Sequence, residues 1–264
     1  MKLELLHEKA QAPEKPVKLL FIHGICTGAW IWQPNFLPFF AGLGYESYAL
    51  SLRGHGNSEG RENIRAFTLA DFADDIEWAL NEIGGPTVVT GYSLGGGVVQ
   101  NYLQRGGKMA GAVLLCSAPP HGLIRAAAAM YASNPKLANE MRAVLHNGLS
   151  AASLDVIEGG LFTEPAPDIR QRFAENIDDI AETACRQLMG WIPFAPFPWG
   201  IPKLLVVGGE KDQFVPAADV RLTAIYYGAR AVIVPNGAHA IMLDKNWRDA
   251  AEPIAGWLDK TFKG

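Results

Sequence analysis

The sequence holds few of the residues that mark disulfide-rich, zinc-binding or exported proteins. Its three cysteines are Cys26, Cys116 and Cys185, spread over 264 residues. They form no C-x-x-C pair, so neither a disulfide framework nor a cysteine zinc site is expected. The opening residues, MKLELLHEKAQAPEKP, are charged throughout and lack the apolar core of a signal peptide. We therefore expect a cytoplasmic protein.

Charge and hydropathy argue against two further classes. The net charge is −4 and no cluster of lysine and arginine stands out, so nucleic-acid binding is not expected. No apolar run approaches the roughly 18 residues of a membrane span, so no stable membrane insertion is expected. The sequence has no G-x-x-x-x-G-K-[ST] loop and no group with metal-ligand spacing. We therefore expect no nucleotide, no metal and no other cofactor.

Six short runs rich in β-branched residues divide the chain. Most are apolar on both faces, which is typical of buried parallel strands. The runs are KLLFIHG (18–24), YESYALSL (45–52), TVVTGYS (87–93), AGAVLLCSA (110–118), KLLVVGG (203–209) and ARAVIVP (229–235). Helical spacing occurs at 69–84 and 96–107, and LELLHEK near the start is a candidate edge strand. This alternation predicts an α/β fold, with a mostly parallel central sheet and helices on both faces.

The alternation stops between residues 119 and 199, where helix-like segments replace strands. A structureless loop of that length is implausible in a compact domain, so we predict a helical insertion. Residues 1–118 and 200–264 then form the core, and residues 119–199 form a helical cap inserted after strand six. Trp191 and Phe194, near the end of the cap, are candidates to line an apolar substrate pocket, and the alternative is that they pack the cap against the core.

A G-x-S-x-G pattern at residues 91–95 directly follows the apolar run TVV and precedes a helix-like segment. The pattern is weak on its own, and the alternative is a glycine-rich turn with a solvated serine. The strand-turn-helix context favours a sharp turn that projects the Ser93 hydroxyl above the sheet. A serine hydroxyl becomes a good nucleophile when a base takes its proton and an acid orients that base.

A candidate acid and a candidate base follow Ser93 in the order that such a site requires. Asp212 comes just after KLLVVGG, and His239 comes just after ARAVIVP. Parallel strands end at one edge of the sheet, so both side chains are expected near Ser93. Asp219 falls inside the next helix and Asp244 follows the histidine, so Asp212 is the preferred acid.

The remaining candidates belong to an oxyanion hole and a substrate pocket. Acyl transfer needs N–H groups that stabilise the negative charge developing on the substrate oxygen. One is expected from the backbone of Leu94, directly after the nucleophile, and the other from Ile25 in FIHGIC. Cys26 and Tyr92, which adjoin these segments, are candidates to line the pocket.

Five motifs follow one another along the chain: HG at 23–24, RGHGNSEG at 53–60, GYSLGG at 91–96, GGEKDQFVP at 208–216 and GAH at 237–239. In this order they resemble the α/β-hydrolase family over nearly the whole sequence. RGHGNSEG is similar to a turn of lysophospholipase-like and monoacylglycerol-lipase-like members. HGICTGAWIW at 23–32 is similar to a loop of plant methylesterases and hydroxynitrile lyases. Those lyases carry threonine and lysine where this chain has Gly24 and Ala240, which favours ester hydrolysis.

The resemblance implies a serine hydrolase of the carboxylesterase or lysophospholipase-like kind. It would cleave esters of small to medium apolar groups through an acyl-enzyme, with Ser93 as nucleophile, His239 as base and Asp212 as orienting acid. The expected partner is a small-molecule ester, and the protein is expected to be a monomer or homodimer. A C–C bond hydrolase, an acyltransferase or a perhydrolase with the same triad is an alternative. A non-catalytic receptor that binds ligands in the pocket is another.

Overall fold

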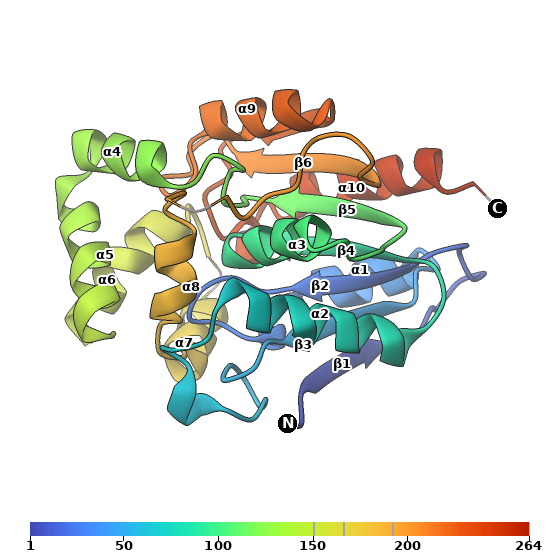
Figure 1. Cartoon of the computed structure of the whole chain (residues 1–264), viewed down its shortest axis with the longest axis horizontal. Coiled ribbons are helices and arrows are strands. Elements are labelled where there is room, and N and C mark those ends of the chain that lie inside the picture. The colour runs from blue at the N-terminus through green and yellow to red at the C-terminus, as the bar shows by residue number, and fades with distance from the viewer. Residues whose placement is uncertain (150, 166, 192, 264) are drawn as a thin grey trace.

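In the computed structural model, which describes residues 1–263 except 150, 166 and 192, a seven-stranded sheet forms the centre of the protein (Figure 1). The strand order is β1-β3-β2-β4-β5-β6-β7. β1 pairs antiparallel with β3, and the other neighbours pair in parallel. The strands are Glu4–Glu8 (β1), Lys18–Ile22 (β2), Ser47–Ser51 (β3), Thr87–Tyr92 (β4), Gly111–Leu115 (β5), Lys203–Gly209 (β6) and Arg230–Val234 (β7). Each predicted run contributes one strand, which confirms the α/β class.

Helices cover both faces of the sheet, because alternate side chains of each buried strand point to opposite faces. Leu20 and Ile22 pack with α2 (Leu69–Ile83), α3 (Leu94–Gln104) and α9 (Ala217–Tyr227). Leu19 and Phe21 pack with α1 (Phe36–Gly42) and α10 (Arg248–Thr261). Three short 3-10 helices are η1 (Ala29–Trp32), η2 (Arg61–Asn63) and η3 (Ile241–Leu243). Within the described residues, no helix is long and apolar enough to cross a membrane.

Helix α2 shows how local sequence fixes an element. The Thr68 hydroxyl accepts the Asp71 N–H at 3.2 Å, and the Asp71 carboxylate accepts the Thr68 N–H at 2.8 Å. This reciprocal capping starts the helix. Gly84, with a φ of +62°, ends it while its N–H donates to the Leu80 carbonyl oxygen. The apolar face of α2 is thereby held against the sheet.

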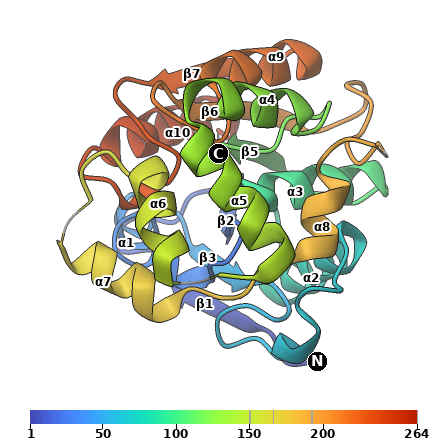
Figure 2. The ribbon, with the colours of Figure 1, turned by 90° about the vertical axis from the view of Figure 1, so that its left-hand side faces the viewer.

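The described residues between β5 and β6 form five helices: α4 (Ile124–Ser133), α5 (Pro135–Asn147), α6 (Ala151–Leu161), α7 (Pro167–Asn176) and α8 (Glu182–Gln187). Figures 1 and 2 show these helices gathered at the end of the sheet to which the parallel strands point. Five described strands, β1 to β5, precede these helices, and β6 follows them. The insertion therefore follows the fifth strand rather than the sixth, which the sequence predicted. The boundaries of a separate cap at 119 and 199 stay a prediction.

Candidate active site

Ser93 occupies the sharp turn between β4 and α3. Its φ of +52° is in the left-handed region, which residues other than glycine rarely adopt. Two glycines make this turn possible. A Cβ on Gly91 would lie 2.5 Å from the Gly95 carbonyl oxygen, and a Cβ on Gly95 would clash with the His23 carbonyl oxygen. The glycines are therefore required by close packing of strand against helix, and the turn they allow is tight.

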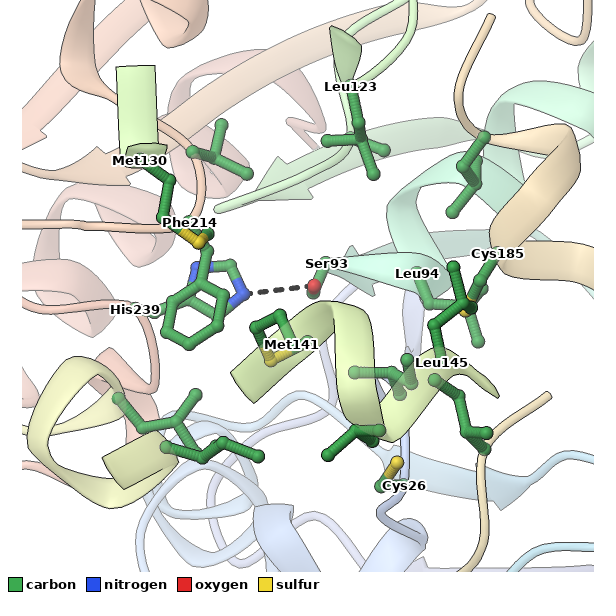
Figure 3. A pocket seen from close by; sticks show the side chains of 18 of the residues that line it. Cys26, Ser93, Leu94, Leu123, Met130, Met141, Leu145, Cys185, Phe214 and His239 are labelled. Carbon is green, nitrogen blue, oxygen red and sulfur yellow. Dashed lines mark hydrogen bonds between the residues drawn. The ribbon is translucent and has the colours of Figure 1, made fainter. Parts of the chain in front are cut away.

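Ser93, His239 and Asp212 meet at the carboxyl end of the sheet. Ser93 Oγ lies 2.9 Å from His239 Nε2, the contact drawn in Figure 3, and His239 Nδ1 lies 2.8 Å from Asp212 Oδ2. The other carboxylate oxygen of Asp212 accepts the N–H groups of Phe214 and Val215 at 2.8 and 2.9 Å. Asp212 thus presents one fixed oxygen to the imidazole. This contact keeps a proton on Nδ1 and leaves Nε2 free to accept the Ser93 hydroxyl proton.

Cys116, at the carboxyl end of β5, lies behind this relay. Burial, followed by the negative charge of the neighbouring Asp212, raises the pKa of its thiol well above its ordinary value. Cys116, Asp212 and His239 bring possible metal-ligand atoms within 4.8 Å of one another. Asp212 and His239 already use both of their oxygens and both of their nitrogens in hydrogen bonds. These oxygen and nitrogen atoms are therefore not free to coordinate a metal ion.

The expected oxyanion donors, the N–H groups of Ile25 and Leu94, belong to two residues that line the cavity beside Ser93. Neither N–H has an acceptor within the part of the chain that the structure describes. Leu94 is the first residue of α3, where the N–H groups lack intrahelical acceptors and the helix dipole favours negative charge. Ile25 N–H shares a peptide unit with the Gly24 carbonyl, and the two groups point in opposite directions.

His23 and Thr27 orient that peptide unit, a role that sequence reasoning missed. Leu52 N–H donates to His23 Nε2 at 3.0 Å, which places the histidine proton on Nδ1. Nδ1–H then donates to the Gly24 carbonyl oxygen at 2.7 Å, and the Thr27 hydroxyl donates to the same oxygen at 3.2 Å. Burial, followed by the neighbouring His55, lowers the pKa of His23 well below its ordinary value. The HG motif is the one sequence signal for His23, and Thr27 carries none.

A cavity of about 360 Å³ opens beside Ser93 beneath the inserted helices. Cys26 and Tyr92 line it, as the sequence predicts. Arg142, at the exposed rim, is the one permanently charged side chain among the described lining residues. Figure 3 shows the apolar wall closing around the Ser93–His239 contact. Side chains labelled there include Leu123, Met130, Met141, Leu145, Cys185 and Phe214.

Trp191 and Phe194 do not line this cavity, contrary to the prediction from sequence. Trp191 is 80% exposed, and Phe194 is buried in the apolar cluster beneath α2 and α3. The segment that carries them runs along the outside of the core, where Gln104 of α3 donates to the Pro193 carbonyl oxygen at 3.0 Å. An aromatic, proline-rich composition does not specify which way its rings point, so the sequence could not place them.

Comparison with known proteins identifies the family. The model of the alpha/beta hydrolase family matches residues 19–252, so the chain belongs to this family. Protein ABHD8 of Homo sapiens and that of Mus musculus are each 25% identical to it over 239 residues. Each match covers 86% of this chain and 52% of the relative. The chain therefore spans about half the length of these curated relatives.

Solved structures with this fold include esterases and a lipase. A bromoperoxidase from Bacillus anthracis has a TM-score of 0.76 at 18% identity, covering 97% of this chain and 96% of its own. An esterase from Exiguobacterium antarcticum has a TM-score of 0.75 at 15% identity, with coverages of 97% and 95%. A monoacylglycerol lipase from Paleococcus ferrophilus has a TM-score of 0.71 at 18% identity, with coverages of 99% and 100%. At these identities the likeness shows the fold alone.

Proposed function

We propose that the protein hydrolyses carboxylic esters of small to medium apolar acyl or alcohol groups through an acyl-enzyme on Ser93. The observation that carries the proposal is the relay of hydrogen bonds from Ser93 Oγ through His239 to Asp212, at 2.9 and 2.8 Å. The relay adjoins an apolar cavity and two N–H groups that lack acceptors in the described structure. Membership of the hydrolase family and esterase neighbours of the same fold support it.

In the first half of the reaction, Ser93 Oγ attacks the ester carbonyl carbon while its proton passes to His239 Nε2. The negative charge that develops on the carbonyl oxygen is stabilised by the N–H groups of Ile25 and Leu94. Asp212 stabilises the imidazolium through Nδ1. The tetrahedral intermediate then collapses, the C–O bond to the alcohol breaks, and His239 returns its proton to the departing alkoxide oxygen.

In the second half, water replaces the alcohol beside His239. The imidazole takes a proton from the water as the oxygen attacks the acyl carbon, and the same two N–H groups hold the oxyanion again. Collapse breaks the bond to Ser93, which regains its proton from His239 and releases the carboxylic acid. Every proton in this cycle moves through groups of this chain, the substrate or water, so the proposed reaction needs no cofactor.

The cavity supports an apolar substrate of limited size. Its volume of about 360 Å³ is near the lower end of the range of ligand sites, about 300–1,000 Å³. Aliphatic and methionine side chains form most of its wall, and the charged Arg142 side chain lies at the exposed rim. An apolar acyl or alcohol group fits such a wall because it leaves no buried polar group unpaired.

Fluorophosphonate labelling tests the nucleophile, and ester hydrolysis tests the reaction. The protein is expected to be labelled and to turn over p-nitrophenyl esters, whereas Ser93→Ala should lose the label and about 10⁴-fold or more in turnover. Ser133→Ala, at an exposed serine of α4, is the matched control and should keep both. An unlabelled wild-type protein would favour the receptor alternative. A labelled protein without ester hydrolysis would favour a C–C bond hydrolase, an acyltransferase or a perhydrolase.

A further inference from the structure

Helix α9 exposes large apolar side chains on its outer face and packs others against the sheet on its inner face. Val220 and Ala224 pack against the sheet, while Leu222, Ile225 and Tyr226 point outward. Ile225 is 75% exposed. Helices that are apolar all round are normally buried, whereas a surface helix normally turns polar residues outward. The outer face of α9 is therefore a surface without a partner in the described chain.

The aromatic segment before β6 extends this surface. Phe197 and Trp199 are 70% and 74% exposed and stack on each other with ring centroids 5.3 Å apart. The Tyr226 hydroxyl donates to the Pro196 carbonyl oxygen at 3.1 Å, which joins the segment to α9. Figure 1 shows the chain between α8 and β6 passing between α3 and α9. We call this surface the α9 patch, defined as Phe197, Trp199, Leu222, Ile225 and Tyr226.

Three cationic residues adjoin the α9 patch in the sequence. Arg221 lies on the outer face of α9 itself, next to Leu222. Lys203 starts β6 directly after the aromatic segment, and Arg230 starts β7 directly after α9. All three side chains are exposed, and none forms an ion pair with any residue that the structure describes.

Negative charge is nearly missing from the same stretches of sequence. Residues 191–203 contain no aspartate or glutamate, and residues 217–230 contain Asp219 alone. Asp219 is fully buried and lies within 3.5 Å of His121 and 3.3 Å of Arg125, on the side of α4. The segments that form the α9 patch therefore expose apolar and cationic side chains and no carboxylate.

The apolar and cationic side chains of the α9 patch favour one of two possible binding partners, a second copy of the chain or a lipid surface. A two-fold dimer would place the α9 patch of one copy against the same patch of the other, so cations would face cations with no carboxylate between them. An anionic lipid surface complements both features, because phosphate groups attract the cations and the acyl boundary accepts the rings. Tryptophan and tyrosine side chains favour this boundary, since one end is apolar and the other is polar.

We propose that the α9 patch docks the protein on the surface of an anionic lipid bilayer. Phe197, Trp199 and Ile225 enter the boundary between headgroups and acyl chains, and the three cations contact lipid phosphates. Docking is a binding event and is independent of the chemistry proposed for Ser93.

Co-sedimentation with lipid vesicles tests the proposal. The wild-type chain and Ser93→Ala should bind equally to vesicles of phosphatidylcholine mixed with phosphatidylglycerol, and weakly to phosphatidylcholine alone. The double variant Phe197→Ser/Trp199→Ser should lose most of the binding. Lys203→Gln/Arg221→Gln should bind about thirtyfold more weakly, since each cation near an anionic surface contributes about fivefold. Added salt should weaken binding by the wild-type chain.

Matched variants separate docking from general effects of charge and hydropathy. Lys9→Gln/Lys260→Gln makes the same change in net charge after β1 and on α10, which packs on the other face of the sheet from α9, and Leu43→Ser removes an exposed apolar side chain beside α1. Both should bind like the wild type. Equal binding to both vesicle types, or no binding to either, would overturn the proposal. So would a wild-type dimer that Phe197→Ser/Trp199→Ser converts to monomers, because the patch would then be an interface between copies.

Discussion

Replacing Asp212 by asparagine tests how the relay controls the proton on His239. One carboxylate oxygen of Asp212 accepts two backbone N–H groups, from Phe214 and Val215, and the other accepts His239 Nδ1–H. Asparagine has one oxygen and one NH₂ group for these two places. If the oxygen stays with the backbone, the NH₂ group donates to Nδ1. The proton of the imidazole then moves to Nε2, which can no longer accept the Ser93 proton.

The opposite orientation of the asparagine amide would keep the productive tautomer but would leave two buried N–H donors facing an NH₂ group. Each unsatisfied donor costs about 1–3 kcal/mol, so this orientation is disfavoured by about 2–6 kcal/mol. That difference corresponds to a loss of roughly 30-fold to 10⁴-fold in the productive state. The lost negative charge beside the imidazolium adds to it. We therefore expect kcat for a p-nitrophenyl ester to fall by about 10⁴-fold at neutral pH.

Asp244→Asn is the matched control for Asp212→Asn. Asp244 is also a buried acid near His239, but its oxygens accept the N–H groups of Thr163 and Glu164. This variant should lose stability and keep kcat within a few fold of the wild type. Stopped-flow measurement of p-nitrophenol release from folded protein, checked by circular dichroism, gives both rates. A loss of less than tenfold in Asp212→Asn, or an equal loss in both variants, would refute the reasoning.

Three further perturbations test the fold and the pocket. Burial lowers the pKa of His55 from 6.5 to about 4, so the folded state resists a proton that the unfolded state accepts. The free energy of unfolding should therefore fall by about 3 kcal/mol as the pH drops from about 6.5 to about 4. Urea denaturation should show less of this loss in His55→Gln, and an unchanged pH dependence would contradict it. Gly95→Ala should lower the free energy of unfolding by about 2 kcal/mol or more, since the added Cβ would clash with the Ile22 carbonyl oxygen of β2. A urea midpoint equal to that of the wild type would contradict the tight turn. Ala138→Leu, in the cavity wall, should lower kcat/KM for long acyl esters more than for short ones, and a uniform change would contradict that location.

The sheet and the relay could be predicted because each depends on a pattern that survives in a single sequence. Buried parallel strands are apolar on both faces, and the six predicted runs all became strands. Ser93 and His239 are 146 residues apart in sequence, and Asp212 and His239 are 27 apart. They meet because each follows a parallel strand, and parallel strands end at one edge. The topology of a parallel sheet was therefore enough to predict that these three side chains meet, without knowledge of their individual contacts.

Side-chain directions in irregular segments could not be predicted in the same way. Trp191 and Phe194 lie in a segment without helical or strand periodicity, so the sequence could not tell the exposed ring from the buried one. Thr27 contributes through one hydrogen bond to the Gly24 carbonyl oxygen, and Cys116 lies beside Asp212 and His239. Such contacts depend on tertiary packing, and no spacing of residue types in the sequence predicts them.

The inserted helices contribute to the floor of the site as well as to its wall. Asp178, in the chain between α7 and α8, donates its N–H to the Cys26 carbonyl oxygen at 2.8 Å, and its carboxylate accepts the Gly56 N–H at 2.7 Å. Cys26 has a φ of +58° and directly follows Ile25, the expected oxyanion donor. The strained loop that carries this donor is therefore held from one side by His23 and Thr27 of the core, and from the other by the insertion. The backbone geometry of the expected oxyanion donor therefore depends on contacts from the insertion as well as on contacts from the core.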